Sequence, residues 1–367
     1  MAKQGNIFEN YAKEMKNDMA TIVGQQGMIG DCEEFLDTGS YMLNAIMSAD
    51  LFKGLPKNKT IAIASDSGIG KSFFCVSIAK EFQKNHPNGY VVYYETENAF
   101  TTKMFEERGV DLNRLLYVPI GTVEQFRHEA TKFVHNYNEL PEDEKLPFIM
   151  ILDSIGNLST EKEYEDAITG ANKTDMTKGR LVKSALRTLK MELSRANAPL
   201  IMTNHVYSQI GSMYPEDVMT GGKGPLFLSD VVLFLTKRKD KDGTVQVGNF
   251  IKARARKSRF TKENSLVEIY LSFKTGISKY HGLLPFAEKA GVFKRIGNRY
   301  EVGDGRKLYE KAIMDKPEEF FTQEVLEKIN NVIHSEFSYG EGEETTEELY
   351  KDEEETLKSI STELVEN

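Results

Sequence analysis

A segment near residue 70 of this 367-residue chain has the residue types and spacing of a phosphate-binding loop. It reads SDSGIGKS over residues 65–72 and matches seven of the eight positions of the pattern G-x-x-x-x-G-K-[ST], because Ser65 replaces the first glycine. In such loops backbone N–H groups surround phosphate oxygens, the lysine reaches the β and γ phosphates, and the hydroxyl binds Mg²⁺. The pattern therefore predicts a triphosphate and Mg²⁺ site. Its residues are Ser65, Asp66, Ser67, Gly68, Ile69, Gly70, Lys71 and Ser72.

The segments around this loop predict the elements that would hold it. Residues 60–64 are β-branched or apolar and predict a buried strand, and the apolar residues of 73–79 recur at helical spacing. A second β-rich run, 90–94, follows that helix. The order strand, helix, strand is a βαβ unit. It predicts the α/β class, with a mostly parallel central sheet flanked by helices and with ligands at the carboxyl ends of the strands.

Acidic residues follow two of the predicted strands. Glu95 and Glu97 come after the run 90–94; they are either solvated charges at a strand end, or one of them positions and polarises water beside the phosphates. The apolar run 148–152 ends at Asp153. An aspartate at the end of a buried strand, downstream of a phosphate loop, is typical of the carboxylate that holds hydrated Mg²⁺ near the loop serine.

Two long polar segments, 159–178 and 205–224, show no clear periodicity and predict irregular loops. Long loops in a compact domain are usually functional. Each follows a predicted strand on the ligand-bearing edge of the sheet, so the two could form one shared surface. Between them the spacing predicts a helix over 180–194, with Arg180 and Arg187 on one face.

A dense basic cluster lies between two predicted strands in the second half of the chain. Its default interpretation is a solvated, charged hairpin. The alternatives are contact with a phosphate backbone, or cations supplied to the nucleotide of a neighbouring copy. The cluster consists of Lys252, Arg254, Arg256, Lys257, Arg259 and Lys262.

Charge is distributed unevenly along the chain. The formal net charge is −9, but residues 336–367 contain 12 acidic residues and 2 lysines, so the rest of the chain carries +1. The tail is either a solvated disordered end or a competitor for a basic groove. Two cysteines are too few for a disulfide framework or a zinc site, and no segment has the pattern of a membrane span or a secretory signal. We therefore expect a reducing cytoplasm.

The chain divides into four predicted regions. Residues 1–30 form an arm, 31–275 the core, 276–334 a small C-terminal region, and 335–367 an acidic, disordered tail. In the arm, apolar residues at 8–19 fall on one face of a short helix. An isolated helix cannot bury such a face, so we expect it to dock either on its own core or on a neighbouring subunit.

The order of these motifs resembles the RecA-like P-loop ATPase core of the RecA/Rad51-family recombinases, and most of all that of the phage UvsX-like recombinases. The resemblance covers about residues 30–290. It is carried by TGS at 38–40, SDSGIGKS at 65–72, YYETEN at 93–98, RGVDL at 108–112, ILDSIGNL at 151–158, MTNHV at 202–206, TGGKGP at 220–225 and KSR at 257–259. It implies a DNA-dependent ATPase of homologous recombination, which forms ATP-bound helical filaments on single-stranded DNA and promotes pairing and strand exchange with homologous duplex DNA.

The resemblance also implies roles for single residues of the ATP site. Glu97 would act on the attacking water, and Asp153 would hold Mg²⁺ together with Ser72. His205 stands where many relatives have a glutamine that senses the γ-phosphate. Met104 stands where relatives often have a tyrosine that stacks on adenine.

The same resemblance implies DNA contacts and a contact between subunits. Lys257 and Arg259 would reach ATP bound to the adjacent subunit of a filament. The two irregular segments would be DNA-binding loops. The implied DNA-binding residues are Arg180, Arg187, Gly211, Gly221 and Gly222.

Two other functions are compatible with these motifs. A hexameric DNA helicase of the same superfamily shares the phosphate loop and the acidic positions, but the TGS and TGGKGP motifs favour the recombinase. A non-catalytic assembly factor would bind ATP without useful turnover, although the residue types needed for hydrolysis are present. For a phage recombinase, a single-strand binding protein and a recombinase loader are candidate partners in the cytoplasm of a bacterial host, without membrane contact.

Overall fold

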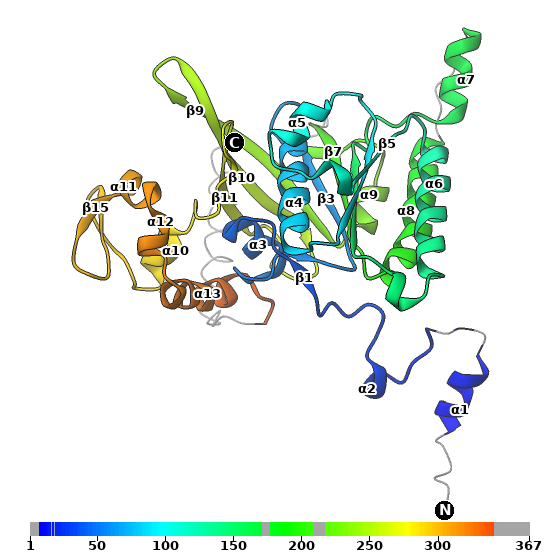
Figure 1. Ribbon diagram of the computed structural model, residues 1–367, viewed down its shortest axis with the longest axis horizontal. Coiled ribbons are helices and arrows are strands. Elements are labelled where there is room, and N and C mark those ends of the chain that lie inside the picture. The colour runs from blue at the N-terminus through cyan, green and yellow to red at the C-terminus, as the bar shows by residue number, and fades with distance from the viewer. Residues whose placement is uncertain (1–6, 16, 18, 171–176, 209–216, 341–367) are drawn as a thin grey trace, which may run out of the picture.

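The computed structural model describes residues 7–15, 17, 19–170, 177–208 and 217–340. Its core is a ten-stranded sheet with helices on both faces, which confirms the predicted α/β class (Figure 1). The strands are β3 Thr60–Ser65, β4 Tyr90–Glu95, β5 Leu115–Pro119, β6 Phe148–Asp153, β7 Leu200–Ser208, β8 Asp217–Met219, β9 Val231–Asp242, β10 Val245–Ser258, β11 Leu266–Ser272 and β12 Gly276–Ile277.

The strand order places the predicted ligand-binding strands next to one another in this sheet. Along its main path the order is β12-β11-β10-β9-β3-β7-β6-β4-β5, and β8 pairs with β7. From β9 to β5 each strand is parallel to its neighbour, whereas β10, β11 and β12 are antiparallel. The carboxyl ends of β3, β4, β6 and β7 therefore meet at one edge, as a βαβ arrangement requires.

Helices cover both faces because the central strands are apolar throughout. All side chains of β3 and β6 are buried, and successive side chains point to opposite faces. Ile61 and Ile63 pack in one apolar cluster with α3 and α4, while Ala62 and Ala64 pack in a second cluster with α6 and α8. The helices of the arm and core are α1 Ile7–Glu14, α2 Val23–Gln26, α3 Tyr41–Ser48, α4 Lys71–Asn85, α5 Thr102–Glu106, α6 Val123–Asn138, α7 Glu161–Thr169, α8 Lys178–Arg195 and α9 Gly224–Leu228.

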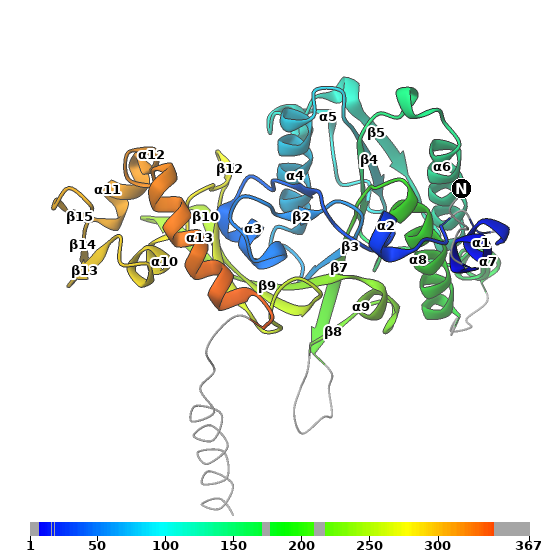
Figure 2. The same ribbon diagram turned by 90° about the horizontal axis from the view of Figure 1, so that it is seen from below.

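The C-terminal region packs on the side of the core that α3 covers (Figure 2). Ile329 and Ile333 of its last helix share one apolar cluster with Met42 of α3. The Asn330 side chain accepts a hydrogen bond of 2.7 Å from the Leu51 backbone N–H. The elements of this region are α10 Leu284–Lys289, β13 Lys294–Ile296, β14 Arg299–Glu301, β15 Lys307–Tyr309, α11 Glu310–Asp315, α12 Pro317–Phe320 and α13 Gln323–Phe337.

Two segments that the sequence predicts as irregular contain regular structure in their described parts. The segment 159–178 includes α7, which begins with a capping box formed by Thr160 and Glu163. The segment 205–224 begins with the end of the long strand β7 and later contains β8. The prediction of irregular backbone was wrong here. Helix α7 is polar, and its capping box stabilises its first turn. It has no buried apolar face, so the spacing of apolar residues does not predict it.

The N-terminal arm does not bury its apolar face on the described part of its own core. Helix α1 ends at Glu14, earlier than predicted, and none of its residues is buried. Phe8 is 69% exposed and Tyr11 is 56% exposed. The helix lies apart from the sheet and its covering helices (Figure 1).

Candidate active site

The phosphate loop joins β3 to α4 as its sequence predicts. Lys71 is the first residue of α4, and Gly70 is its N-cap. Gly68 has φ +69° and Gly70 has φ +121°, in the region that side chains disfavour. A Cβ atom at Gly70 would lie 2.9 Å from Leu271 of β11. Glycine is therefore required at both positions for this turn, which places the N-terminus of α4 beside the cavity.

The Lys71 ammonium is fixed inside this loop. It donates hydrogen bonds to the backbone oxygens of Ser65 and Asp66, at 3.1 and 3.0 Å, and to the Ser65 hydroxyl at 3.2 Å. Burial lowers the pKa of Lys71, and the carboxylates of Asp153 and Glu97 oppose this shift. The serine that replaces the first glycine of the motif thus provides a side-chain contact to the lysine.

Asp153 lies at the end of β6 and lines the same cavity as Ser72. Its carboxylate accepts a hydrogen bond of 2.8 Å from the Tyr93 hydroxyl and another from Thr203. Burial is the main cause that raises the pKa of Tyr93, and Asp153 adds to it. In the described residues no group of three or more His, Cys, Asp and Glu side chains could hold a metal alone. One hydroxyl and one carboxylate fit Mg²⁺, which also binds substrate phosphates and water.

The structure separates the two acidic residues after β4. Glu95 is buried, and its carboxylate accepts hydrogen bonds from the backbone N–H groups of Glu97, Asn98 and Ala99, at 3.0, 2.5 and 3.2 Å. It also accepts one from the Tyr117 hydroxyl at 3.0 Å. Glu97 instead lines the cavity, with 45% of its side chain exposed. Glu95 therefore shapes the loop, and only Glu97 is placed to meet a ligand.

This division of roles predicts a large loss of stability for one substitution and almost none for the other. Replacing Glu95 with alanine leaves three backbone N–H groups without a partner. We expect the free energy of unfolding to fall by about 2–4 kcal/mol, measured by urea denaturation. The matched variant Glu97→Ala removes an exposed carboxylate and should change it by less than about 0.5 kcal/mol. Equal losses in the two variants would contradict the assignment.

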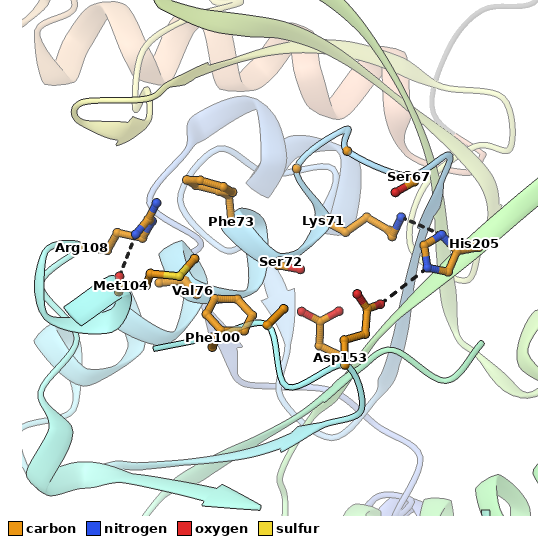
Figure 3. A pocket seen from close by; sticks show the side chains of 14 residues that line it. Ser67, Lys71, Ser72, Phe73, Val76, Phe100, Met104, Arg108, Asp153 and His205 are labelled. Atoms are coloured by element: carbon orange, nitrogen blue, oxygen red, sulfur yellow. Dashed lines mark hydrogen bonds and ion pairs between the residues drawn. The ribbon is translucent and has the colours of Figure 1, made fainter. Parts of the chain in front are cut away.

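His205, near the carboxyl end of β7, lies beside Lys71 (Figure 3) and also close to Glu97. Its Nδ1 is 3.4 Å from the Lys71 Nζ, and its Nε2 is 3.8 Å from a carboxylate oxygen of Glu97. Because an ammonium can only donate, Nδ1 accepts, and the proton of a neutral ring then sits on Nε2, which faces the carboxylate. Glu97 also accepts a hydrogen bond from the Asn157 side chain.

His205 is also joined to the segment that carries the glycine pair. Its backbone oxygen accepts a hydrogen bond of 2.9 Å from the Thr220 N–H, and the Thr220 hydroxyl donates to Asn204 at 2.6 Å. Gly221 and Gly222 follow directly, both with φ +80°. Hydrogen bonds to the ring and to the backbone of His205 therefore connect Lys71 of the phosphate loop with Thr220, the residue before this pair.

The other end of the cavity is apolar, and its residues were largely missed from sequence. The cavity has a volume of about 270 Å³. Met104 lines it as the resemblance implies, but Phe73, Phe100 and Arg108 line it too. Phe73 and Phe100 gave no signal beyond apolar type. Arg108 lies in a short loop after α5, where a cation is usually solvated.

Two predicted nucleotide ligands, Lys257 and Arg259, do not reach this cavity within one chain. The Lys257 ammonium donates to the backbone oxygens of Phe227 in α9 and of Ser229 just after it, both at 2.8 Å. Burial is the main cause that lowers its pKa. The Arg259 guanidinium is 3.0 Å from the carboxylate of Asp230. Their predicted role toward an adjacent subunit stays a prediction.

The predicted DNA-binding residues gather around the start of α8. Arg180 and Arg187 line one hollow of about 500 Å³ together with Arg127 and Lys183. The backbone of Gly222 approaches that of Gly179 at the first turn of α8. Gly211 lies outside the described residues.

None of the described helices has the length and apolar character needed to cross a bilayer.

The fold and the site define a class of protein. A glycine-containing phosphate loop on the central strand of a mostly parallel sheet, facing an aspartate at the end of a nearby strand, is the arrangement of a P-loop nucleotide-binding protein. Comparison with protein families gives a more specific result. The family model described as the RecA N-terminal domain matches residues 8–278. The chain belongs to the RecA family, which confirms the resemblance.

Single relatives agree with this assignment. The "Recombination and repair protein" of Enterobacteria phage T4 is 32% identical over 257 residues, which cover 70% of this chain and 64% of that protein. The "Protein RecA" of Rhodospirillum rubrum is 26% identical over 322 residues, covering 85% and 81%. That of Aquifex aeolicus is 26% identical over 292 residues, covering 78% and 80%.

Proposed function

We propose that this protein is a DNA-dependent ATPase of homologous recombination. It forms ATP-bound helical filaments on single-stranded DNA and promotes pairing and strand exchange with homologous duplex DNA. Membership of the RecA family and a relative named for recombination and repair support this proposal. The single observation that carries it is the set of contacts from Lys71 through His205 to the glycine pair.

These contacts give ATP a route to the DNA-binding surface. A triphosphate draws the Lys71 ammonium toward its oxygens and so weakens the contact of Lys71 with His205. Because the His205 backbone oxygen accepts a hydrogen bond from Thr220, a shift of His205 moves the segment that begins at Gly221. The coupling is reciprocal, so DNA bound at this segment strengthens ATP binding by the same factor.

Hydrolysis requires a base near the γ-phosphate and neutralisation of the phosphate charge. The Glu97 carboxylate faces the cavity and accepts the proton of the attacking water. Lys71 and the backbone N–H groups of 68–72 bind the phosphates. Ser72 and Asp153 would hold Mg²⁺, which would supply neutralisation of the charge on the phosphate oxygens.

Two features of the single chain support assembly. No residue of α1 is buried in the described part of the chain, and a neighbouring copy would bury its apolar face. Lys257 and Arg259 lie away from the cavity of their own chain, and in a filament they approach the ATP of the next copy. ATP then sits between two subunits, so its binding favours assembly.

The proposed DNA surface favours binding that does not depend on base sequence. Arg180 and Arg187 have no ion pair in the described part of the chain, and the neighbouring Gly221 and Gly222 offer backbone N–H groups. Contacts of cations and backbone amides with phosphate carry no base-sequence information. Recombination requires such generality. A single-strand binding protein and a loader are the proposed partners, in the cytoplasm of a bacterial host.

The proposal is tested by measuring ATP hydrolysis with and without single-stranded DNA and viewing the same sample by negative-stain electron microscopy. We expect DNA to stimulate hydrolysis and helical filaments to form. Closed rings with DNA-stimulated hydrolysis would instead favour the helicase. Absence of both stimulation and filaments would reject the proposal.

A further inference from the structure

The cavity has two chemically different ends (Figure 3). Lys71, Asp153 and His205 lie at one end, and Phe73, Val76, Phe100, Met104 and Arg108 lie at the other. A nucleotide whose phosphates occupy the first end directs its base to the second. Among the residues at the second end, Arg108 is the one with a charged or hydrogen-bonding side chain.

Arg108 is held in place on two sides. Its guanidinium carbon lies 4.3 Å from the centre of the Phe73 ring, so that ring covers the guanidinium. Its Nη1 donates a hydrogen bond of 2.8 Å to the backbone oxygen of Met104. The Met104 N–H in turn is capped by the Thr101 hydroxyl at the start of α5, at 3.4 Å. Arg108 makes no ion pair with the described carboxylates, so its other N–H groups are available to a ligand.

We propose that Arg108 contacts the base of the bound nucleotide, and that the site accepts guanine nucleotides as well as adenine nucleotides. This inference rests on the proposed ATP-binding function. A guanidinium offers donors and no acceptor. Guanine presents two adjacent acceptors, O6 and N7, which match the guanidinium fork. Adenine presents the acceptor N7 beside an amino group, which can only donate.

The remaining wall binds either purine. Phe100 and Met104 supply an aromatic ring and a polarisable thioether, which contact the face of a base and not its edge. Base stacking of this kind tolerates different bases because every base has a π-face. No side chain at this end offers a strong acceptor for the adenine amino group. The wall therefore holds adenine without rejecting guanine, and Arg108 adds a contact that guanine uses better.

The test compares the binding of ADP and GDP to the full chain with Mg²⁺, by isothermal titration calorimetry. We expect the wild-type protein to bind the two with affinities within about tenfold. Arg108→Leu keeps an aliphatic side chain on Phe73 but removes the donors, so GDP affinity should fall by about 10- to 100-fold and ADP affinity by less than about threefold. Lys103→Leu removes an exposed cation of α5 that does not line the cavity, and it should change neither affinity.

The outcomes separate this inference from the proposed function. Tight ADP binding without GDP binding would overturn the inference and leave the ATPase proposal intact. Equal losses of ADP and GDP affinity in Arg108→Leu would mean that Arg108 only shapes the cavity, which also overturns it. The variant Arg108→Lys keeps the charge but lacks the fork, and full GDP affinity there would contradict the bidentate contact. If the wild-type chain binds neither nucleotide, the proposed function itself fails.

Discussion

Replacing Glu97 with glutamine is expected to lower DNA-stimulated ATP turnover by about 10²- to 10⁴-fold and to leave ATP affinity unchanged within about twofold. Glutamine has the same shape and can keep the contact with Asn157, but it cannot accept a proton from water. The measurements are kcat with saturating single-stranded DNA and the dissociation constant of a non-hydrolysable ATP analogue.

A matched control is available on the neighbouring helix. Glu106 of α5 is exposed and does not line the nucleotide cavity, so Glu106→Gln should hydrolyse ATP at the wild-type rate. Filaments should still form with Glu97→Gln, because assembly needs bound ATP and not its hydrolysis. Turnover that survives in Glu97→Gln would show that another group activates the water. It would also reopen the assignment of Glu95 as a structural residue.

The parts of the site that the sequence predicts well are contiguous in the chain. The phosphate loop occupies residues 65–72 between a strand and a helix, and each of its requirements is local: glycines for the turn, a lysine, a hydroxyl. The α/β class follows in the same way, because the buried strands β3 and β6 are apolar along their whole length. Local chemistry therefore suffices for these features.

The two glutamates show where local reasoning stops. Glu95 and Glu97 have the same type and follow the same strand, so the sequence leaves their roles open. The difference arises because residues 97–99 turn their N–H groups onto Glu95, and because Tyr117 from the adjacent strand β5 adds a fourth donor. That arrangement depends on strand pairing between distant segments. Only the folded chain shows which carboxylate is already satisfied.

The sequence does not predict the end of the cavity that would bind the base, for the same reason. Phe73 belongs to α4 and Arg108 to the loop after α5, and their contact depends on how α5 returns toward α4. Neither residue type is informative at its own position. The resemblance assigns a base contact to Met104 alone, and Arg108 enters it only as the first residue of the motif RGVDL, without a role. Phe73 and Arg108 come together only when α4 and α5 pack in the folded chain.

Replacing Lys71 with alanine is expected to weaken binding of both ADP and GDP by at least about 100-fold, because the ammonium supplies charge-assisted hydrogen bonds to phosphate. The simplest measurement is thermal unfolding with and without ATP. A ligand at 100 times its dissociation constant stabilises the folded state by about 2.7 kcal/mol, so the wild-type melting temperature should rise with ATP. In Lys71→Ala that rise should disappear.

Without nucleotide, Lys71→Ala should unfold close to the wild-type temperature, because two effects of the substitution in the phosphate loop oppose each other. Burial lowers the pKa of Lys71, so keeping the charged ammonium in the folded state costs stability. This cost is present at neutral pH. It is lost as the pH rises through the lowered pKa of the folded state toward 10.5, the pKa of the unfolded state. Alanine removes this penalty together with the hydrogen bonds to Ser65 and Asp66, and the two changes oppose each other. Lys80→Ala, an exposed lysine of the same helix, should keep the full ATP-induced rise. A rise retained in Lys71→Ala would place the phosphates elsewhere.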